Sequence, residues 1–337
     1  MLGSSLLVCA VLLALVPTAG ARVGATASLR TPPVACGDGL VRAGRGCTHG
    51  GDLVPPNVER IATRAMAPAA STPKQMCVAN GRGGRRIRVF YGYPAGTESR
   101  SAAFRSWIRQ SVAMADANLD EQTPGIAGQH LRMYCKEDRG VTVSALELLP
   151  IGTDGVFTFQ DVMDSLLQRV ANGLGDEDFD TPRLTYVVFV DNIGCCYGPS
   201  GQAMLWGDDR PDPALNLNNQ VMYSPRFAMV EIGGSTFSGA YIFLHEVGHT
   251  LGAVQDSAPH SSRAGHCYTS SDVMCYADGG PYYDEGGSMQ AVCAAMPDGQ
   301  FAFDCEGGDY YEVHPDPGSY LASAWNTSDS GWLTKPG

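Results

Sequence analysis

Apolar residues along the chain change their spacing in a way that predicts alternating strands and helices. Residues 87–91 (IRVFY) alternate as in a strand, and 184–190 (LTYVVFV) form an unbroken apolar run. Such a run is typical of a strand covered on both faces. Apolar residues at helical spacing predict helices over 102–119 and 157–174, and 131–135 fit a further strand. This order predicts an α/β-like N-terminal half built on a buried sheet.

The second half of the pattern ends in one more helix. Residues 203–206 are suited to a short edge strand, and 227–232 predict the last strand before a Gly-Gly turn. Residues 236–251 predict a helix that Gly252 can end in a left-handed turn. From about residue 253 the chain is rich in Gly, Asp, Cys and aromatic residues. We therefore expect an α+β fold with a loop-rich, disulfide-bonded C-terminal subdomain.

The beginning of the chain carries the features of an export signal. Residues 6–16 are an apolar run of signal-peptide length, and 19–21 supply the small residues that signal peptidase reads. The run is too short to span a bilayer, so we expect removal of 1–21, secretion and no membrane association afterwards. Residues 22–76 are expected to form an extension or pro-segment, followed by a catalytic domain at 77–337.

Composition and charge exclude several classes of protein. A chain of 337 residues with 44% hydrophobic residues can bury a core, which excludes extended disorder. The net charge of −12 has the wrong sign for binding phosphates, so we expect no nucleic-acid partner. Of the 11 cysteines, all but Cys9 follow the predicted signal, and their even number favours disulfides. Cys36 is therefore expected to be paired rather than to serve as a zinc-binding thiolate.

The motif that carries chemistry lies in the last predicted helix, where His245, Glu246 and His249 form the pattern HExxH. Residues four apart share one helix face, at about 5 to 6 Å between Cβ atoms, so both imidazoles can bind one metal ion. Glu246 lies about 100° further round, where its carboxylate can take a proton from metal-bound water. The pattern predicts half of a catalytic zinc site; the alternative is an amphipathic helix with two histidines on its polar face.

Together with its surroundings, this motif resembles that of the metzincin clan of zinc peptidases, HExxHxxGxxH followed by a Met-turn, in a secreted bacterial form. The match covers both histidines, Glu246, Gly252 and Met274, which lies 25 residues after the second histidine. The resemblance implies a metzincin-like fold with a twisted mixed sheet, a bound Zn²⁺ and Met274 beneath it. It also implies that Tyr276 donates to the oxyanion, as in the astacin-like and serralysin-like branches. A polypeptide substrate is expected to enter extended, beside residues 203–206.

The third metal ligand departs from the pattern of the clan, because Gln255 stands where the clan has a histidine. An amide oxygen is a weak donor to zinc beside imidazole. We favour His266, since a disulfide between Cys267 and Cys275 would tie its loop to the Met-turn. The other candidates for this position are His260, Gln255, Asp256 and, for another zincin branch, Glu285.

The sequence therefore predicts a secreted, monomeric zinc endopeptidase that hydrolyses peptide bonds through a zinc-activated water, with Glu246 as the general base. A second hypothesis is a secreted binding or structural protein that keeps the metzincin-like fold but has lost its metal site at Gln255. Metal content and peptide hydrolysis distinguish the two.

Overall fold

The computed structural model describes residues 36, 40–43, 46–52, 76–77, 84–121, 128–136, 140–149, 157–171, 183–191, 200–221, 226–233, 235–292, 301–305 and 307–335. Residues 34–337 form one compact unit. The predicted export signal at 1–21 lies outside the described residues, as do Cys195, Cys196 and Cys293. Within the described ranges, no helix has both the length and the apolar character that crossing a membrane requires.

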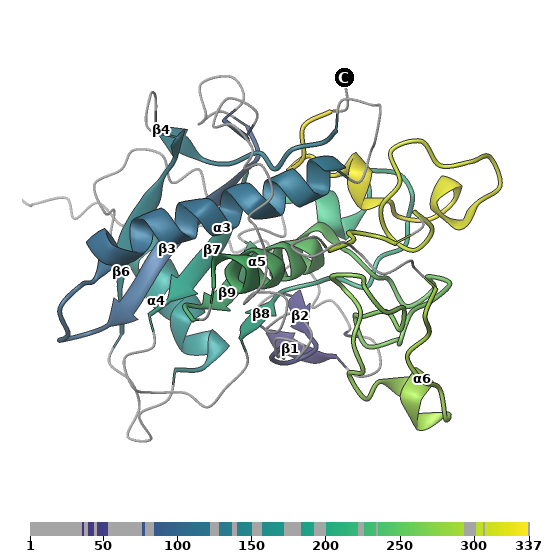
Figure 1. The fold of residues 1–337 in the computed structure, drawn as a ribbon, viewed down its shortest axis with the longest axis horizontal. Coiled ribbons are helices and arrows are strands. Elements are labelled where there is room, and N and C mark those ends of the chain that lie inside the picture. The colour runs from purple at the N-terminus through teal and green to yellow at the C-terminus, as the bar shows by residue number, and fades with distance from the viewer. Residues whose placement is uncertain are drawn as a thin grey trace, which may run out of the picture. The chain divides into compact units, whose positions relative to one another are not determined.

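In the described part of the chain, the centre of the fold is a five-stranded mixed sheet with the order β6, β3, β7, β9, β8 (Figure 1). Its strands are β3 (Arg86–Pro94), β6 (Val143–Leu148), β7 (Leu184–Val190), β8 (Gly201–Ala203) and β9 (Arg226–Glu231). The first four strands of this order are parallel, and β8 pairs antiparallel with β9 at one edge. The structure confirms the expected α+β class and the mixed sheet.

The central strand is β7, and all seven of its residues are buried, as its unbroken apolar run predicts. The prediction for residues 131–135 is wrong, because they contribute isolated bridges and part of the two-residue strand β4 (Cys135–Lys136) rather than a strand of the main sheet. The outer strand beside β3 is instead β6, which the pattern misses. Its polar Ser144 and Glu147 interrupt the apolar residues, as expected for a strand at the sheet edge.

Among the described residues, three long helices pack on the sheet, at the positions that helical spacing predicts. They are α3 (Ser101–Glu121), α4 (Phe159–Ala171) and α5 (Thr236–Leu251). The shorter elements are β1 (Val41–Ala43), β2 (Gly46–Thr48), β5 (Gly140–Val141), α6 (Pro281–Asp284) and the 3₁₀ turns η2 (Leu217–Asn219), η4 (Tyr320–Ala322) and η5 (Thr327–Asp329).

Side chains of the sheet alternate between two apolar cores. On β7, Val187 and Phe189 pack into the core that contains α3 and α5, and Tyr186 and Val188 into the core that contains α4. This period of two along a strand separates the helices into layers on opposite faces (Figure 1). Helix α5 is buried from Phe237 to Leu251, because C-terminal loops cover the side that the sheet and α3 leave open. The predicted metal-binding helix is therefore the most enclosed helix of the fold.

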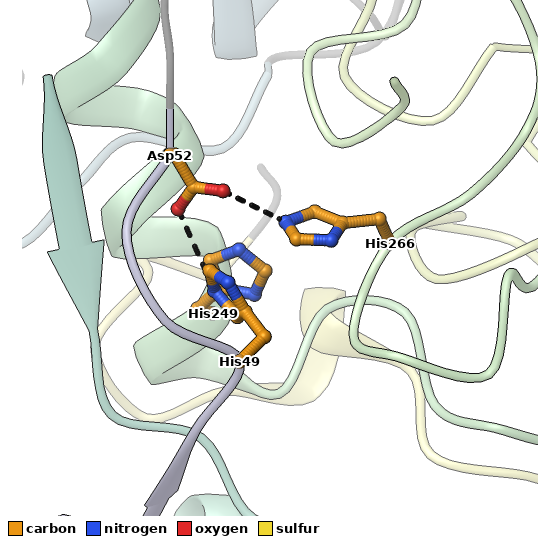
Figure 2. A group of neighbouring side chains, drawn as sticks. All are labelled: His49, Asp52, His249 and His266. Carbon is orange, nitrogen blue, oxygen red and sulfur yellow. Dashed lines mark ion pairs between the residues drawn. The ribbon is translucent and has the colours of Figure 1, made fainter. Parts of the chain in front are cut away.

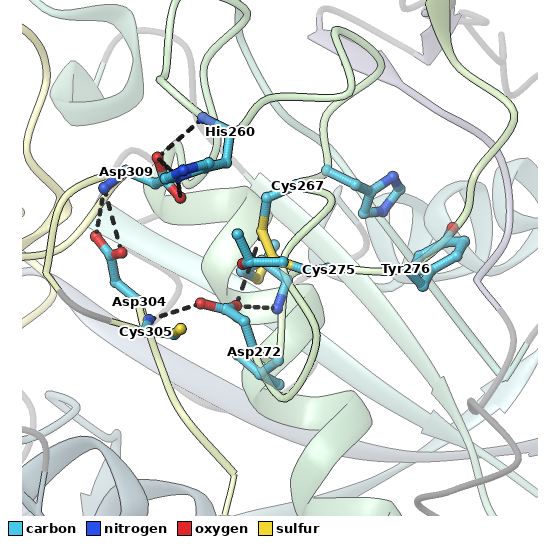
Figure 3. The surroundings of a disulfide bond; sticks show 12 residues. His260, Cys267, Asp272, Cys275, Tyr276, Asp304, Cys305 and Asp309 are labelled. Carbon is cyan, nitrogen blue, oxygen red and sulfur yellow. Dashed lines mark hydrogen bonds and ion pairs between the residues drawn. A yellow bond between two sulfur atoms is a disulfide. The ribbon is translucent and has the colours of Figure 1, made fainter. Parts of the chain in front are cut away.

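Disulfides anchor both the N-terminal region and the C-terminal loops. Cys36 is bonded to Cys47, so the expectation that Cys36 is paired is confirmed. Cys267 is bonded to Cys275, as predicted (Figure 3). Between them, the Asp272 carboxylate accepts hydrogen bonds from the backbone N–H groups of Met274 at 2.7 Å and Cys305 at 2.8 Å. This buried carboxylate therefore fixes the loop that carries the predicted Met-turn.

Candidate metal centre

Helix α5 presents the two histidines of the motif on one face. The helix starts after Ser235, whose side chain accepts from the N–H of Ser238, and ends at Gly252 with a left-handed φ of 87°. The Nε2 atoms of His245 and His249 lie 3.1 Å apart. Two nitrogens bound to one tetrahedral zinc ion at about 2.0 to 2.1 Å are separated by about 3.3 Å. The spacing of the two imidazoles therefore fits binding of a single ion.

The loop after α5 brings His266 to these two histidines. Its ring centroid lies 4.9 Å from that of His249 and 5.3 Å from that of His245, and the residue is fully buried. Its Nδ1 lies 2.9 Å from the Asp278 carboxylate, and His245 Nδ1 lies 2.6 Å from the carbonyl oxygen of Val273. Hydrogen bonds at Nδ1 leave Nε2 free to bind a metal, which is the usual arrangement around metal-binding histidines.

The other candidates for the third ligand lie elsewhere. The Gln255 amide is fully engaged, because its oxygen accepts from the N–H of Asp208 at 2.7 Å and its nitrogen donates to the carbonyls of Trp206 at 3.1 Å and Gly252 at 2.9 Å. The Gln255 side chain therefore joins the end of α5 to the chain that follows β8. Asp256 is exposed.

Two more candidates are occupied by partners of their own. His260 Nδ1 lies 3.0 Å from the Asp309 carboxylate, and the two residues face each other away from Tyr276 (Figure 3). Glu285 is exposed and forms an ion pair with Arg263 at 2.5 Å. Neither side chain belongs to the histidine cluster of α5.

Two further residues, His49 and Asp52, complete this cluster, and the sequence pattern does not predict them (Figure 2). The possible ligand atoms of His49, Asp52, His249 and His266 all lie within 4.8 Å of one another. The Asp52 oxygens lie 3.1 Å from His266 Nε2, 3.4 Å from His245 Nε2 and 3.5 Å from His49 Nε2. The only sequence signal is the short run HGGD at residues 49–52, in which two ligand-type residues are three apart.

Charge and burial make this cluster suited to a cation. Burial raises the pKa of a carboxyl, but His49, His245 and His266 outweigh it and hold the pKa of Asp52 well below its usual range. Burial and the adjacent Asp52 raise the pKa of Glu246 well above its usual range. Burial lowers the pKa of His49 to about 3 and that of His249 well below its usual value. Burial lowers the pKa of His266, but Asp52 and Asp278 outweigh it and raise this pKa to about 9. Imidazoles packed around a buried carboxylate form a donor set that a divalent cation satisfies.

Hydrogen bonding supports the same conclusion. Among the described residues, several buried atoms of this cluster form no hydrogen bond of good geometry. They are the two carboxylate oxygens of Glu246, the Nε2 atoms of His49 and His266, and Oδ2 of Asp52. Buried polar atoms of native proteins nearly always have a partner. A metal ion with its bound water would supply partners for these atoms, so the residues present fit such a group.

Met274 packs against α5, and Tyr276 lies beside His266 and Asp52 of the cluster. Met274 is fully buried against α5, where a Cβ added at Gly248 would lie 2.6 Å from its sulfur. The Tyr276 ring centroid lies 4.4 Å from that of His266, and its hydroxyl donates to the Asp52 carboxylate. Burial and Asp52 raise the pKa of Tyr276, so its hydroxyl remains a donor at neutral pH.

The close contact between α5 and Met274 gives a first prediction. Gly248→Ala is expected to lower the free energy of unfolding by about 1 to 2 kcal/mol, because the clash with Met274 outweighs the gain in helix propensity. Urea unfolding measures the change. Gly207→Ala is the control, since a Cβ added at Gly207 meets no atom within 4 Å. A Gly248→Ala protein as stable as the wild type would contradict this packing.

A second group of possible ligand atoms contains Cys267, Asp272 and Cys275. Its two sulfurs are joined in a disulfide, and Asp272 already accepts the backbone hydrogen bonds of the Met-turn loop. Metal binding at neutral pH needs thiolate sulfur. The histidine cluster is therefore the candidate metal centre of the described chain.

Together, the fold and the site define a mixed α+β protein with a buried cluster of histidines and carboxylates suited to a metal ion. In comparisons with known proteins, no protein-family model and no curated protein matches the chain. Among solved structures, the chain is similar to metalloproteinase-II from Bacteroides fragilis, with a TM-score of 0.32 and 15% identity over 64% of this chain and 53% of that one. The chain thus spans about half the length of that protein. A likeness of this size carries no argument about the site.

Proposed function

We propose that this chain is a secreted zinc-dependent endopeptidase of the metzincin type, with His245, His249 and His266 as the zinc ligands. The observation that carries the proposal is the convergence of these three buried imidazoles beside Glu246. Three protein ligands and one open position are typical of catalytic zinc sites, whereas structural sites have four protein ligands. The α+β fold, which holds the histidines on a buried helix, is compatible with this class.

Bound zinc would supply a water of lowered pKa and a Lewis acid for the scissile carbonyl. Glu246 then takes a proton from the attacking water and passes it to the leaving amine. The Tyr276 hydroxyl donates a hydrogen bond to the oxygen of the attacked carbonyl. Strand β8 lies at the edge of the main sheet, where an extended peptide could pair in place of residues 47–52, which hydrogen-bond to Gly201 and Leu205 in this structure. Gly201 of this strand lies so close to Glu246 that an added Cβ would overlap the carboxylate, so a peptide paired there passes near the base.

The alternative of a binding protein whose metal site is lost at Gln255 has less support. Gln255 holds the chain after β8 through three hydrogen bonds, and His266 supplies a third imidazole without it. Secretion and a monomeric state belong to the same proposal as the peptidase. Disulfides such as Cys36–Cys47, Cys77–Cys135 and Cys267–Cys275 support export, because disulfides persist in oxidising compartments.

Removal of the metal tests the proposed function. Casein hydrolysis is measured for the wild type and for Asp52→Ala, in which the position beside Glu246 is free. We expect a chelator to abolish hydrolysis and stoichiometric zinc, but not magnesium, to restore it, because imidazole ligands favour zinc over magnesium. Hydrolysis that survives complete removal of zinc would contradict the proposal.

A further inference from the structure

The third histidine of the proposed ligand set lies on a loop, whereas the other two lie on a helix (Figure 2). The backbone of α5 fixes His245 and His249 about one turn apart. His266 lies outside any helix, and Gln255, at the position where the clan has its third histidine, serves the fold through three hydrogen bonds. The loop of His266 must therefore set the direction of this ring by contacts of its own.

One of these contacts is a buried carboxylate behind the ring. Nδ1 of His266 lies 2.9 Å from Oδ2 of Asp278, and the two side chains are only 1% and 5% exposed. On the other side of the ring, Nε2 lies 3.1 Å from Asp52 and thus faces the histidine cluster. A neutral imidazole carries its proton on one nitrogen. A proton held at Nδ1 by Asp278 therefore leaves Nε2 free to bind a metal.

Asp278 is itself fixed by its surroundings. Its Oδ2 also accepts from the hydroxyl of Ser262 at 2.5 Å, and its Oδ1 accepts from the N–H of Gly280 at 2.8 Å. The N–H of Ser262 in turn donates to the carbonyl of His266 at 2.7 Å. This turn has no room for a side chain at Gly280, because a Cβ added there would lie 2.7 Å from Cβ of Ala264. The carboxylate and the backbone of the ligand are therefore held by one hydrogen-bonded unit.

The segment that carries Asp278 contacts His266 a second time. Tyr276, two residues earlier, places its ring centroid 4.4 Å from that of His266. The Cys267–Cys275 disulfide joins the residue after His266 to the residue before Tyr276. Of these three contacts, only that of Asp278 is a hydrogen bond to a nitrogen of the ring. Asp278 is thus placed to determine which nitrogen faces the metal and in which direction.

We propose that Asp278 is the positioning residue of the metal centre, which orients the His266 imidazole and holds its proton at Nδ1 so that Nε2 can bind the zinc ion. The inference rests on the proposed function, since it concerns a ligand of the same metal ion. A carboxylate bonded to an imidazole also makes the opposite nitrogen a stronger donor. A loop histidine supported by Asp278 thereby takes the place of the ligand that the clan has at position 255.

Zinc affinity, measured by competition with a chromophoric chelator, tests this role without relying on catalysis. The wild type is compared with Asp278→Ala, Asp278→Asn and Asp309→Asn. Asp278→Asn keeps the shape of the side chain and an acceptor oxygen, and guards against misfolding of the alanine variant. Asp309→Asn is the matched control, since Asp309 is a buried carboxylate 3.0 Å from Nδ1 of His260, outside the histidine cluster. Circular dichroism establishes that each variant is folded.

We expect Asp278→Ala to weaken zinc binding by about 10- to 100-fold. Asp278→Asn is expected to weaken it less, because its amide oxygen still accepts the proton at Nδ1, and Asp309→Asn to match the wild type. Equal affinities of the wild type and both Asp278 variants would overturn the positioning role while leaving the peptidase intact. An equal loss in Asp309→Asn would also overturn it, because that loss would come from the fold of the C-terminal loops. Absence of zinc from the folded wild type would instead overturn the proposed function.

The proton on His266 gives a second readout, which a purely structural role of Asp278 would not change. Proton NMR of zinc-loaded protein with isotopically labelled histidine nitrogens shows which ring nitrogen carries the proton. We expect His266 of the wild type and of Asp309→Asn to carry it at Nδ1, with a far-downfield signal that Asp278→Ala loses. A wild type in which His266 carries the proton at Nε2 while zinc is bound would overturn the positioning role.

Discussion

Glu246→Gln, made in the Asp52→Ala protein, is expected to lower kcat for peptide hydrolysis about 10²- to 10⁴-fold while zinc remains bound. The carboxylate is fully buried beside the ligand atoms of His245 and Asp52, so a glutamine of the same shape fits the space. The amide cannot accept a proton from the attacking water. Steady-state hydrolysis of a fluorogenic peptide, together with metal analysis of the same sample, measures both effects.

Glu285→Gln is the matched control for this substitution. Glu285 is an exposed carboxylate in an ion pair with Arg263, and surface pairs contribute little. The kcat of the Glu285→Gln protein is expected to equal that of the Asp52→Ala protein in which it is made. A Glu246→Gln protein that binds zinc and keeps the parent rate would show that another group serves as the base.

His266→Ala is expected to weaken zinc binding by at least about 100-fold, because a direct ligand is lost and even outer partners of ligands contribute about 10- to 100-fold. The affinity is measured by competition with a chromophoric chelator in the Asp52→Ala protein. His260→Ala should leave it unchanged, since that ring pairs with Asp309.

Gln255→Ala tests whether Gln255, which stands where the metzincin clan has histidine, binds the metal or only stabilises the fold. Its loss leaves the N–H of Asp208 without its acceptor, so we expect a less stable fold, by about 1 to 3 kcal/mol. Zinc affinity of the folded fraction should stay unchanged. If Gln255→Ala loses zinc and His266→Ala keeps it, the proposed ligand set is wrong.

The sequence predicts the local elements of this site more successfully than its long-range contacts. The bounds of α5 and its end at Gly252 follow from periodicity and a glycine, both of which act within a few residues. The pairing of Cys267 with Cys275 is also local. In contrast, Asp52 meets Tyr276 across 224 residues, and no spacing rule links such positions.

The pairing of residues 47–52 with the edge of the sheet illustrates a second limit. The edge strand predicted at 203–206 lies slightly earlier, at Gly201–Ala203, and the sequence does not reveal that residues 47–52 pair with this edge. Pairing with an edge uses backbone groups, which every residue carries, so it leaves little trace in side-chain pattern. Only the glycines between His49 and Asp52 indicate an unusual backbone there.

The central claim, that histidines rather than cysteines hold one zinc ion, is tested most directly by X-ray absorption at the zinc edge on the Asp52→Ala protein. We predict about one zinc per chain, surrounded by at least three imidazole nitrogens at about 2.0 to 2.1 Å. Folded protein that takes up no zinc, or a spectrum with sulfur neighbours at about 2.3 Å, would contradict the account.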